Sequence, residues 1–276
     1  MILYNPKDWF SLIFRFHKSD TFRRMAWVMI VVGLYTAMLA FLELEYFGLF
    51  KTGLGLLYQL LGFVISLLLV FRTNTAYDRW WEGRKQWGAL VNATRNLALK
   101  SLSSLKESEE RSEFIRLIQA YPDVLRFHLR NAKHPNWSEA NHQPNAVAAK
   151  LNTLLQHFYS SQQISGEQLI LLDRELAEFT DITGACERIK NSPIPFSYNI
   201  FIKKFIFVYV MTMPLAFIPD YGYATIPVVV FVLYVLGSLE LIAEEIEDPF
   251  GEDSNDLPLD SLSDTISKNL DELQSF

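Results

Sequence analysis

The sequence predicts an all-α integral membrane protein with four membrane-crossing helices and a helical region that lies in water. Half of the 276 residues are hydrophobic, yet 20% are charged. The apolar residues gather in uncharged runs near the two ends of the chain, and the polar middle shows no alternating strand pattern. A soluble protein could bury one such helix, but four of them indicate insertion into a membrane.

Residues 1–24 are expected to form an N-terminal cytoplasmic or interfacial helix. Asn5 is a good helix cap, Pro6 suits the first helical position, and Asp8 places an acid in the first turn. Aromatic and basic residues follow. They suit either the bilayer surface or packing against a cytoplasmic domain.

Transmembrane helices 1 and 2 are predicted within residues 25–71. Met25–Leu42 and Leu54–Phe71 are uncharged runs close to the lower limit of bilayer-spanning length. Transmembrane helices 3 and 4 are predicted within residues 205–239, on either side of the single charge at Asp220.

The second run contains a regular stripe of bulky apolar residues. Phe63, Leu67 and Phe71 recur every four residues and therefore share one face of the helix. Small or polar residues lie close to this stripe: Gln59, Gly62 and Ser66. Such a face can meet lipid, another helix or a pore axis.

Residues 72–204 are predicted to form a helical cytoplasmic domain, with the second span continuing into it as one long helix. Ser165 to Gln168 has the spacing of a capping box. It opens a helix whose apolar stripe, which includes Ile182, suits helix packing within a subunit or around a symmetry axis. Ordinary core packing is the more common use of such a stripe. Residues 240–276 are read as an acidic cytoplasmic C-terminal segment.

Lysine and arginine set the expected orientation. They gather before the first span, after the second and before the third, whereas the turn between spans three and four has none. Both termini and the whole middle region are therefore expected in the cytoplasm.

Several classes of protein are disfavoured. The sequence lacks a Gly-x-Gly-x-x-Gly or Walker loop, a nucleophile elbow and a His-Glu-x-x-His motif, so we do not expect an enzyme. His134 and His142 share a loop, but their spacing is a weak signal for a metal site. The net charge of −6 argues against nucleic acid as a partner.

The apolar runs also contain no ionisable residue at mid-membrane, where a proton-coupled pump keeps one. This favours a passive conductor, gated by an apolar constriction, with a membrane scaffold as the alternative.

Three segments together carry a family resemblance. They are Asp78-Arg-Trp-Trp-Glu-Gly-Arg84, Cys186-Glu-Arg-Ile-Lys-Asn-Ser-Pro-Ile-Pro-Phe-Ser-Tyr198 and Asp248-Pro-Phe-Gly-Glu-Asp253. In this order they resemble the bacterial branch of the bestrophin family. The resemblance implies a homopentameric ion channel of the cell inner membrane, surrounded by lipid, with five second-span helices around one pore.

The resemblance also implies site residues. The family neck consists of three apolar rings that end eight residues before the Arg of Arg-Trp-Trp, which gives Phe63, Leu67 and Phe71. The family has a second, cytoplasmic aperture, for which Ile182 is the candidate and Ile170 the competitor.

Animal bestrophins bind Ca²⁺ through the acidic run after Pro-Phe-Gly-Glu-Asp. Asp253 and Asp256 keep matching positions here, but Ser254 and Asn255 replace acids. Calcium gating is therefore in doubt, a structural turn remains the alternative, and no cofactor is expected.

The permeant ion stays open between Cl⁻ and Na⁺. The family name implies chloride, and aromatic ring edges carry slight positive charge. The acidic termini would instead concentrate cations. We expect small monovalent ions, with anions slightly favoured.

Overall fold

The computed structural model describes residues 20–50 and 53–275, so the predicted helix over residues 1–24 lies almost wholly outside them. All regular elements in the described residues are helices, which confirms the all-α class. In chain order they are α2 (Asp20–Leu42), the π-helix η2 (Glu43–Phe47), α3 (Gly55–Ser104), α4 (Glu109–Leu129), the 3-10 turn η3 (Pro135–Trp137), α5 (Gln143–Ser160), α6 (Gly166–Asn191), α7 (Phe196–Tyr221), the 3-10 turn η4 (Gly222–Ala224), α8 (Thr225–Glu247) and α9 (Leu259–Gln274).

The chain forms two compact units. The first combines residues 1–78 with 193–247, and the second combines 79–192 with 248–276. Helix α3 is the expected continuous helix, because it is unbroken over 50 residues and contributes to both units. These two units are defined by which residues pack together, and not by where a membrane would lie. The predicted boundaries of the cytoplasmic domain, at residues 72 and 204, therefore stay a prediction.

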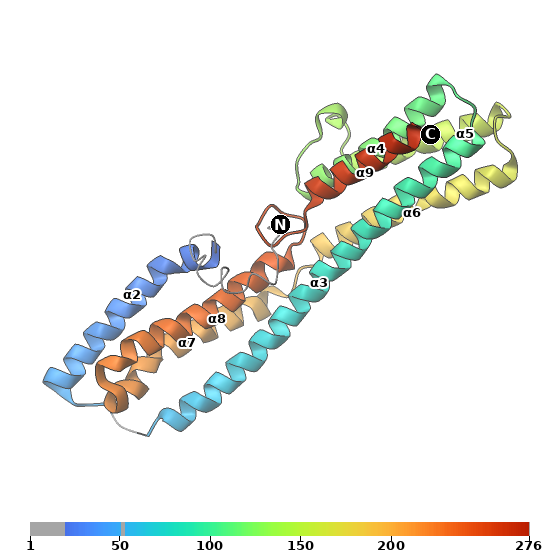
Figure 1. Cartoon of the computed structure of the whole chain (residues 1–276). Helices are drawn as coiled ribbons and strands as arrows, with labels where there is room; N and C mark the ends of the chain where they lie inside the picture. The colour runs from blue at the N-terminus through green and yellow to red at the C-terminus, as the bar shows by residue number, and fades with distance from the viewer. Residues whose placement is uncertain (1–19, 51–52, 276) are drawn as a thin grey trace. The chain divides into compact units, whose positions relative to one another are not determined.

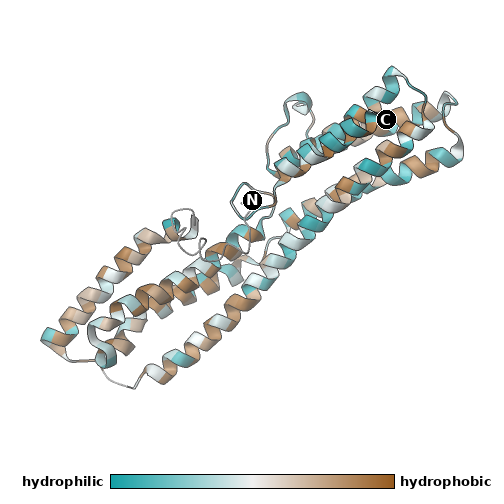
Figure 2. Ribbon diagram, in the orientation of Figure 1, coloured by the Kyte–Doolittle hydropathy of each residue, from teal (hydrophilic) through white to brown (hydrophobic). Residues whose placement is uncertain are grey.

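The first unit holds the apolar helices. Within the described residues, three helical stretches are long and apolar enough to cross a membrane: Thr21–Phe47, Gly55–Ser104 and Phe196–Glu247. The third stretch is a helical hairpin, because η4 interrupts it and α7 packs beside α8 (Figure 1). Gly222 ends α7 with a φ of 53°, a conformation that glycine adopts without steric cost. Brown, hydrophobic residues dominate these helices in Figure 2.

The second unit is a helical bundle with its own hydrophobic core. Helix α5 packs between α4 and α6, and the second half of α3 adds buried Trp87, Leu90 and Leu97. The expected capping box is confirmed: the Ser165 hydroxyl accepts a hydrogen bond from the Gln168 backbone N–H, and the Gln168 side chain accepts one from Ser165 N–H.

The C-terminal segment is more than a solvated acidic tail. Helix α9 is amphipathic and lies along α4 (Figure 1), with Leu259, Ile266 and Leu270 buried in the core of the second unit. Asp260, in its first turn, pairs with Arg126 and with Arg130, whose Nη2 donates over 2.8 Å to the carboxylate. Hydrophobic burial and these ion pairs together dock α9.

Acidification is expected to loosen α9. The hydrogen bond from Arg130 holds the pKa of Asp260 below its ordinary 3.8, so the pairing stabilises the docked helix above about pH 4 and is lost as the pH falls through the lowered pKa. Amide hydrogen exchange over residues 259–274, corrected for intrinsic rates, should rise between pH 5 and pH 3, taken as approximate test points. In Asp260→Asn this step should be absent; an unchanged step would show that Asp260 does not control docking.

Candidate functional site

The predicted neck residues lie on an exposed face of α3. Phe63 is 69% exposed, Leu67 45% and Phe71 55%. Ile65 and Leu69, on the opposite face, are only 1% and 2% exposed and pack in the core of the first unit. The stripe is therefore turned away from the interior of its own subunit, which leaves it available to a pore, a neighbouring subunit or lipid.

The face that carries the stripe is mixed in polarity. Gln59 and Ser66 are also exposed there, and Asn74 and Asp78 continue the same side of the helix beyond Phe71. The Ser66 hydroxyl donates to the carbonyl of Gly62 over 2.7 Å, which satisfies it within the helix. A helix face that meets only lipid avoids such polar groups. The mixed face supports the neck assignment, which stays a prediction.

A buried ion cluster fixes the position of α3 directly after the stripe. Arg72 is 1% exposed, and its Nη2 donates to Glu247 over 2.7 Å. Its Nε lies 3.6 Å from Glu240, which is also buried. Glu247 accepts further hydrogen bonds from the backbone N–H of Ile194 (2.9 Å) and from Asn199 Nδ2 (3.3 Å).

This cluster joins α3 to α8 and to the start of α7. If α3 turned about its axis, Arg72 would separate from Glu240 and Glu247, and their charges would be left without partners in an apolar interior. The cluster therefore fixes the rotation of α3 about its axis. That rotation decides where Phe63, Leu67 and Phe71 point.

The Arg-Trp-Trp segment, residues 79–81, holds the second unit together through its side chains. Arg79 donates to the carbonyl of Ile189 over 2.6 Å and to that of Ser192, so its guanidinium caps the C-terminus of α6. Trp80 Nε1 donates to the carbonyl of Asn255 over 3.0 Å. Glu82 pairs with Arg188 over 2.7 Å. The three sequence motifs thus meet in space.

Gly83 allows the closest of these approaches. A Cβ atom on Gly83 would lie 3.1 Å from the ring of Phe250, which is fully buried, and 3.2 Å from Pro249. Only glycine lets α3 pack this tightly against the Asp-Pro-Phe-Gly turn.

A pair of glycine substitutions tests this contact. Gly83→Ala should lower the free energy of unfolding, relative to Gly88→Ala, by about 1–3 kcal/mol through overpacking. Gly88 is the matched control, since it lies in the same helix and the nearest atom to an added Cβ, on Arg84, is 3.7 Å away. Both variants gain the same helix propensity, so their difference isolates the contact. Thermal unfolding in detergent measures it, and equal stabilities would refute the close packing.

The two candidates for the cytoplasmic aperture differ in exposure. Ile182 is 3% exposed and lies in the core of the second unit, whereas Ile170 is 70% exposed on α6. A side chain that lines an aperture must reach solvent, so burial argues against Ile182. The apolar stripe that includes Ile182 is the core-facing side of α6.

The acidic loop after α8 is held as a turn. Asp256 is 2% exposed, and its Oδ2 accepts a hydrogen bond from the Asp253 backbone N–H over 2.7 Å. The backbone N–H of Leu257 donates to the carbonyl of Pro249 over 2.9 Å and closes the loop. Calcium takes six to eight oxygen ligands, more than the carboxylates of Asp253 and Asp256 supply in this loop. The residues present fit a turn better than a calcium site.

Cys186 is the single cysteine of the chain and is fully buried. Burial, with a smaller contribution from the charge of Glu187, raises the pKa of its thiol to about 12. Because the thiolate is the reactive form, Cys186 is expected to be inert toward thiol reagents in the folded protein.

Known proteins agree with this architecture. Residues 1–272 match the family described as Bacterial/Fungal Bestrophin protein. A mutant of a bacterial bestrophin homologue from Klebsiella pneumoniae superposes with a TM-score of 0.84 at 25% identity, covering 92% of this chain and all of that one.

Two relatives share more of the sequence. The chain is 37% identical over 231 residues to a voltage-dependent anion channel-forming protein of Nostoc sp., covering 77% of this chain and 75% of the relative. It is 32% identical over 228 residues to the voltage-dependent anion channel-forming protein YneE of Escherichia coli, with 77% and 74% covered.

The fold and its converging motifs define a helical protein with helices able to cross a membrane. The chain belongs to the bestrophin family.

Proposed function

We propose that this chain forms an ion channel in which five copies surround one pore lined by α3, with anions as the favoured permeant ions. Family membership and the anion channel-forming relatives support this function. The observation that carries it is the exposed, mixed-polarity face of α3 with Phe63, Leu67 and Phe71 at its centre. The channel is passive and performs no covalent chemistry.

The proposed topology has four spans in the inner membrane: α2, the first part of α3, α7 and α8. The distribution of lysine and arginine supports a topology with both termini in the cytoplasm. The second unit, with its charged surface, would then face the cytoplasm, and lipid would contact the outer apolar residues of the four spans.

The neck would work as an apolar constriction. Three rings of bulky side chains would strip part of an ion's hydration shell, and small movements of these side chains could empty the neck of water and stop conduction. The edges of Phe63 and Phe71 carry slight positive charge and favour anions. For the cytoplasmic aperture we propose Ile170, because it is the exposed candidate.

A sodium-selective channel is the second candidate. The net charge of −6 and the acidic C-terminal helix would raise the local concentration of cations near the cytoplasmic mouth. Neither feature acts at the neck itself, so we rank this candidate below an anion channel.

One experiment separates the candidates. Detergent-purified protein should run as a pentamer by native mass spectrometry and, in a planar bilayer with asymmetric NaCl, reverse near the equilibrium potential of Cl⁻. Reversal near the equilibrium potential of Na⁺ would favour the cation channel. A monomer that carries no current would favour a membrane scaffold.

Calcium is expected to be dispensable. Since Asp256 is engaged in closing its own turn, we propose that the loop stabilises the fold without a bound ion. Adding a calcium chelator to both sides of the bilayer should leave the open probability unchanged. A loss of current that micromolar Ca²⁺ restores would overturn this proposal.

A further inference from the structure

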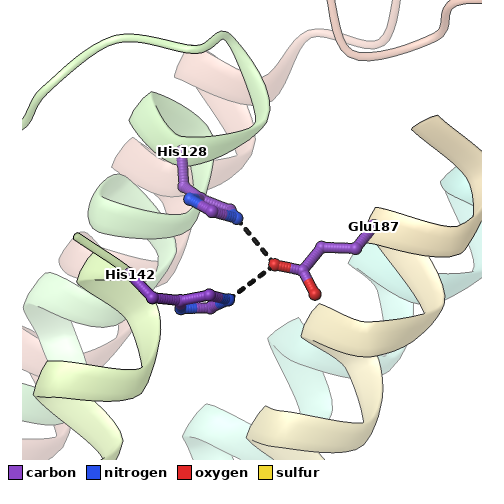
Figure 3. A group of neighbouring side chains, drawn as sticks. All are labelled: His128, His142 and Glu187. Carbon is purple, nitrogen blue, oxygen red and sulfur yellow. Dashed lines mark hydrogen bonds and ion pairs between the residues drawn. The ribbon is translucent and has the colours of Figure 1, made fainter. Parts of the chain in front are cut away.

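Two histidines and a glutamate from three helices meet on the second unit (Figure 3). His128 lies in the last turn of α4, His142 is the N-cap of α5, and Glu187 lies on α6. The Nε2 atoms of His128 and His142 lie 2.6 Å and 2.7 Å from the same oxygen, Oε1 of Glu187. The centroids of the two imidazole rings are 4.5 Å apart.

The geometry points to a site for a divalent transition-metal ion of the zinc class, held by His128, His142 and Glu187. Two imidazole nitrogens and one carboxylate oxygen are a ligand set that binds Zn²⁺ and leaves a fourth position for water. Calcium and magnesium prefer sets made of oxygen alone, so they fit this group poorly.

The three side chains are partly accessible, which an exchangeable site requires. The side chains of His128, Glu187 and His142 are 25%, 28% and 35% exposed. Water can therefore reach the group and complete the coordination. Lys190, the nearby cation on α6, donates from its Nζ to Asn131 Oδ1 over 2.6 Å and to the backbone carbonyl of His128 over 3.4 Å, and both acceptors are atoms other than the three proposed ligand atoms.

The ligand atoms need only a small rearrangement. Ligands at about 2.0–2.2 Å from a tetrahedral ion lie roughly 3.3 Å from one another. The present nitrogen–oxygen distances of 2.6 Å and 2.7 Å are those of hydrogen bonds, so the ion would move the rings apart by less than roughly 1 Å.

Binding would also shift protons. Nδ1 of His142 accepts a hydrogen bond from the Asn145 backbone N–H over 3.2 Å, so this ring carries its proton on Nε2 and donates it to Glu187. An ion bound to Nε2 needs the lone pair of that nitrogen, so the proton moves from Nε2 to Nδ1. His142 itself releases no proton in this exchange, but its Nδ1 can no longer accept from the Asn145 backbone N–H.

Metal binding is therefore coupled to the first turn of α5. Loss of the His142 cap leaves an orphan backbone N–H at the start of the helix. The ion would hold α4 and α6 together while it loosens the N-terminus of α5.

The full-length channel, purified without a polyhistidine tag, tests this site with ZnCl₂ in titration calorimetry. We expect one Zn²⁺ per subunit and no heat from MgCl₂. In Glu187→Gln the affinity for Zn²⁺ should fall at least about 10-fold, because loss of even a residue that only supports a ligand lowers metal affinity by that factor. Glutamine keeps the two hydrogen bonds and so should preserve the fold. His128→Asn serves as a second variant if Glu187→Gln lowers the melting temperature.

His157→Asn is the matched control, because His157 forms a separate histidine–carboxylate pair with Glu110 at 3.1 Å. It should bind Zn²⁺ as the wild type does. Undiminished binding by both Glu187→Gln and His128→Asn would overturn the site. Amide exchange at Asn145 should accelerate with Zn²⁺, and unchanged or slower exchange would overturn the coupling to α5.

Discussion

Arg72→Leu is expected to lower the free energy of unfolding by about 3–5 kcal/mol, since it leaves buried carboxylates without their charge partner. Glu247 would lose the arginine at 2.7 Å and keep its hydrogen bonds from Ile194 and Asn199, which carry no full charge. Glu240 would lose the cation at 3.6 Å, and its oxygens accept no hydrogen bond among the described residues. The melting temperature in detergent measures this loss.

Arg188→Ala is the matched control for that measurement. Arg188 also forms an ion pair at 2.7 Å, with Glu82, but its side chain is 65% exposed. Surface pairs of this kind contribute about 0–1 kcal/mol. Equal melting temperatures for the two variants would show that the Arg72 cluster does not hold α3 in place.

Leu67→Ala is expected to raise the single-channel current several-fold. Leu67 is the middle of the three proposed neck rings, and its truncation in five subunits would widen the constriction and let it hold water. Leu34→Ala, on α2, is the control, because Leu34 is an exposed leucine (67%) outside the proposed pore helix. Single-channel recording in symmetric chloride compares them. A current that neither variant changes would remove Leu67 from the conduction path.

Much of the helical fold could be predicted from local sequence. The uncharged runs mark the apolar helices, and the Ser165–Gln168 capping box marks the start of α6, because both signals depend on residues close together in the chain. The four-residue repeat of Phe63, Leu67 and Phe71 likewise requires nothing beyond the period of a helix.

Contacts between distant segments carried no such signal. The Arg72–Glu247 pair joins residues 175 positions apart, and Arg79 caps a helix whose end is more than 100 positions away. His128, His142 and Glu187 share no motif spacing, and His134, which shares a loop with His142, instead pairs with Asp123. Only the packing of the helices brings such groups together.

The period of an apolar stripe also does not show which way the stripe faces. The stripe on α6 has the right period for helix packing, but the period is the same whether a stripe faces a symmetry axis or the subunit's own core. Ile182 lies in the core. The amphipathic helix α9 was not predicted, because the C-terminal segment was interpreted from its acidic composition. The buried residues Leu259, Ile266 and Leu270 are few among its many charged residues.

The central claim is that Leu67 faces a water-filled pore, and cysteine accessibility tests it most directly. Cys186 is buried with a raised pKa, so the wild-type chain provides an unreactive background. A charged, membrane-impermeant methanethiosulfonate should modify Leu67→Cys and block its current, while Leu34→Cys on α2 stays functional. A Leu67→Cys channel that conducts but resists the reagent would contradict the account, since its thiol would then lie outside the aqueous path.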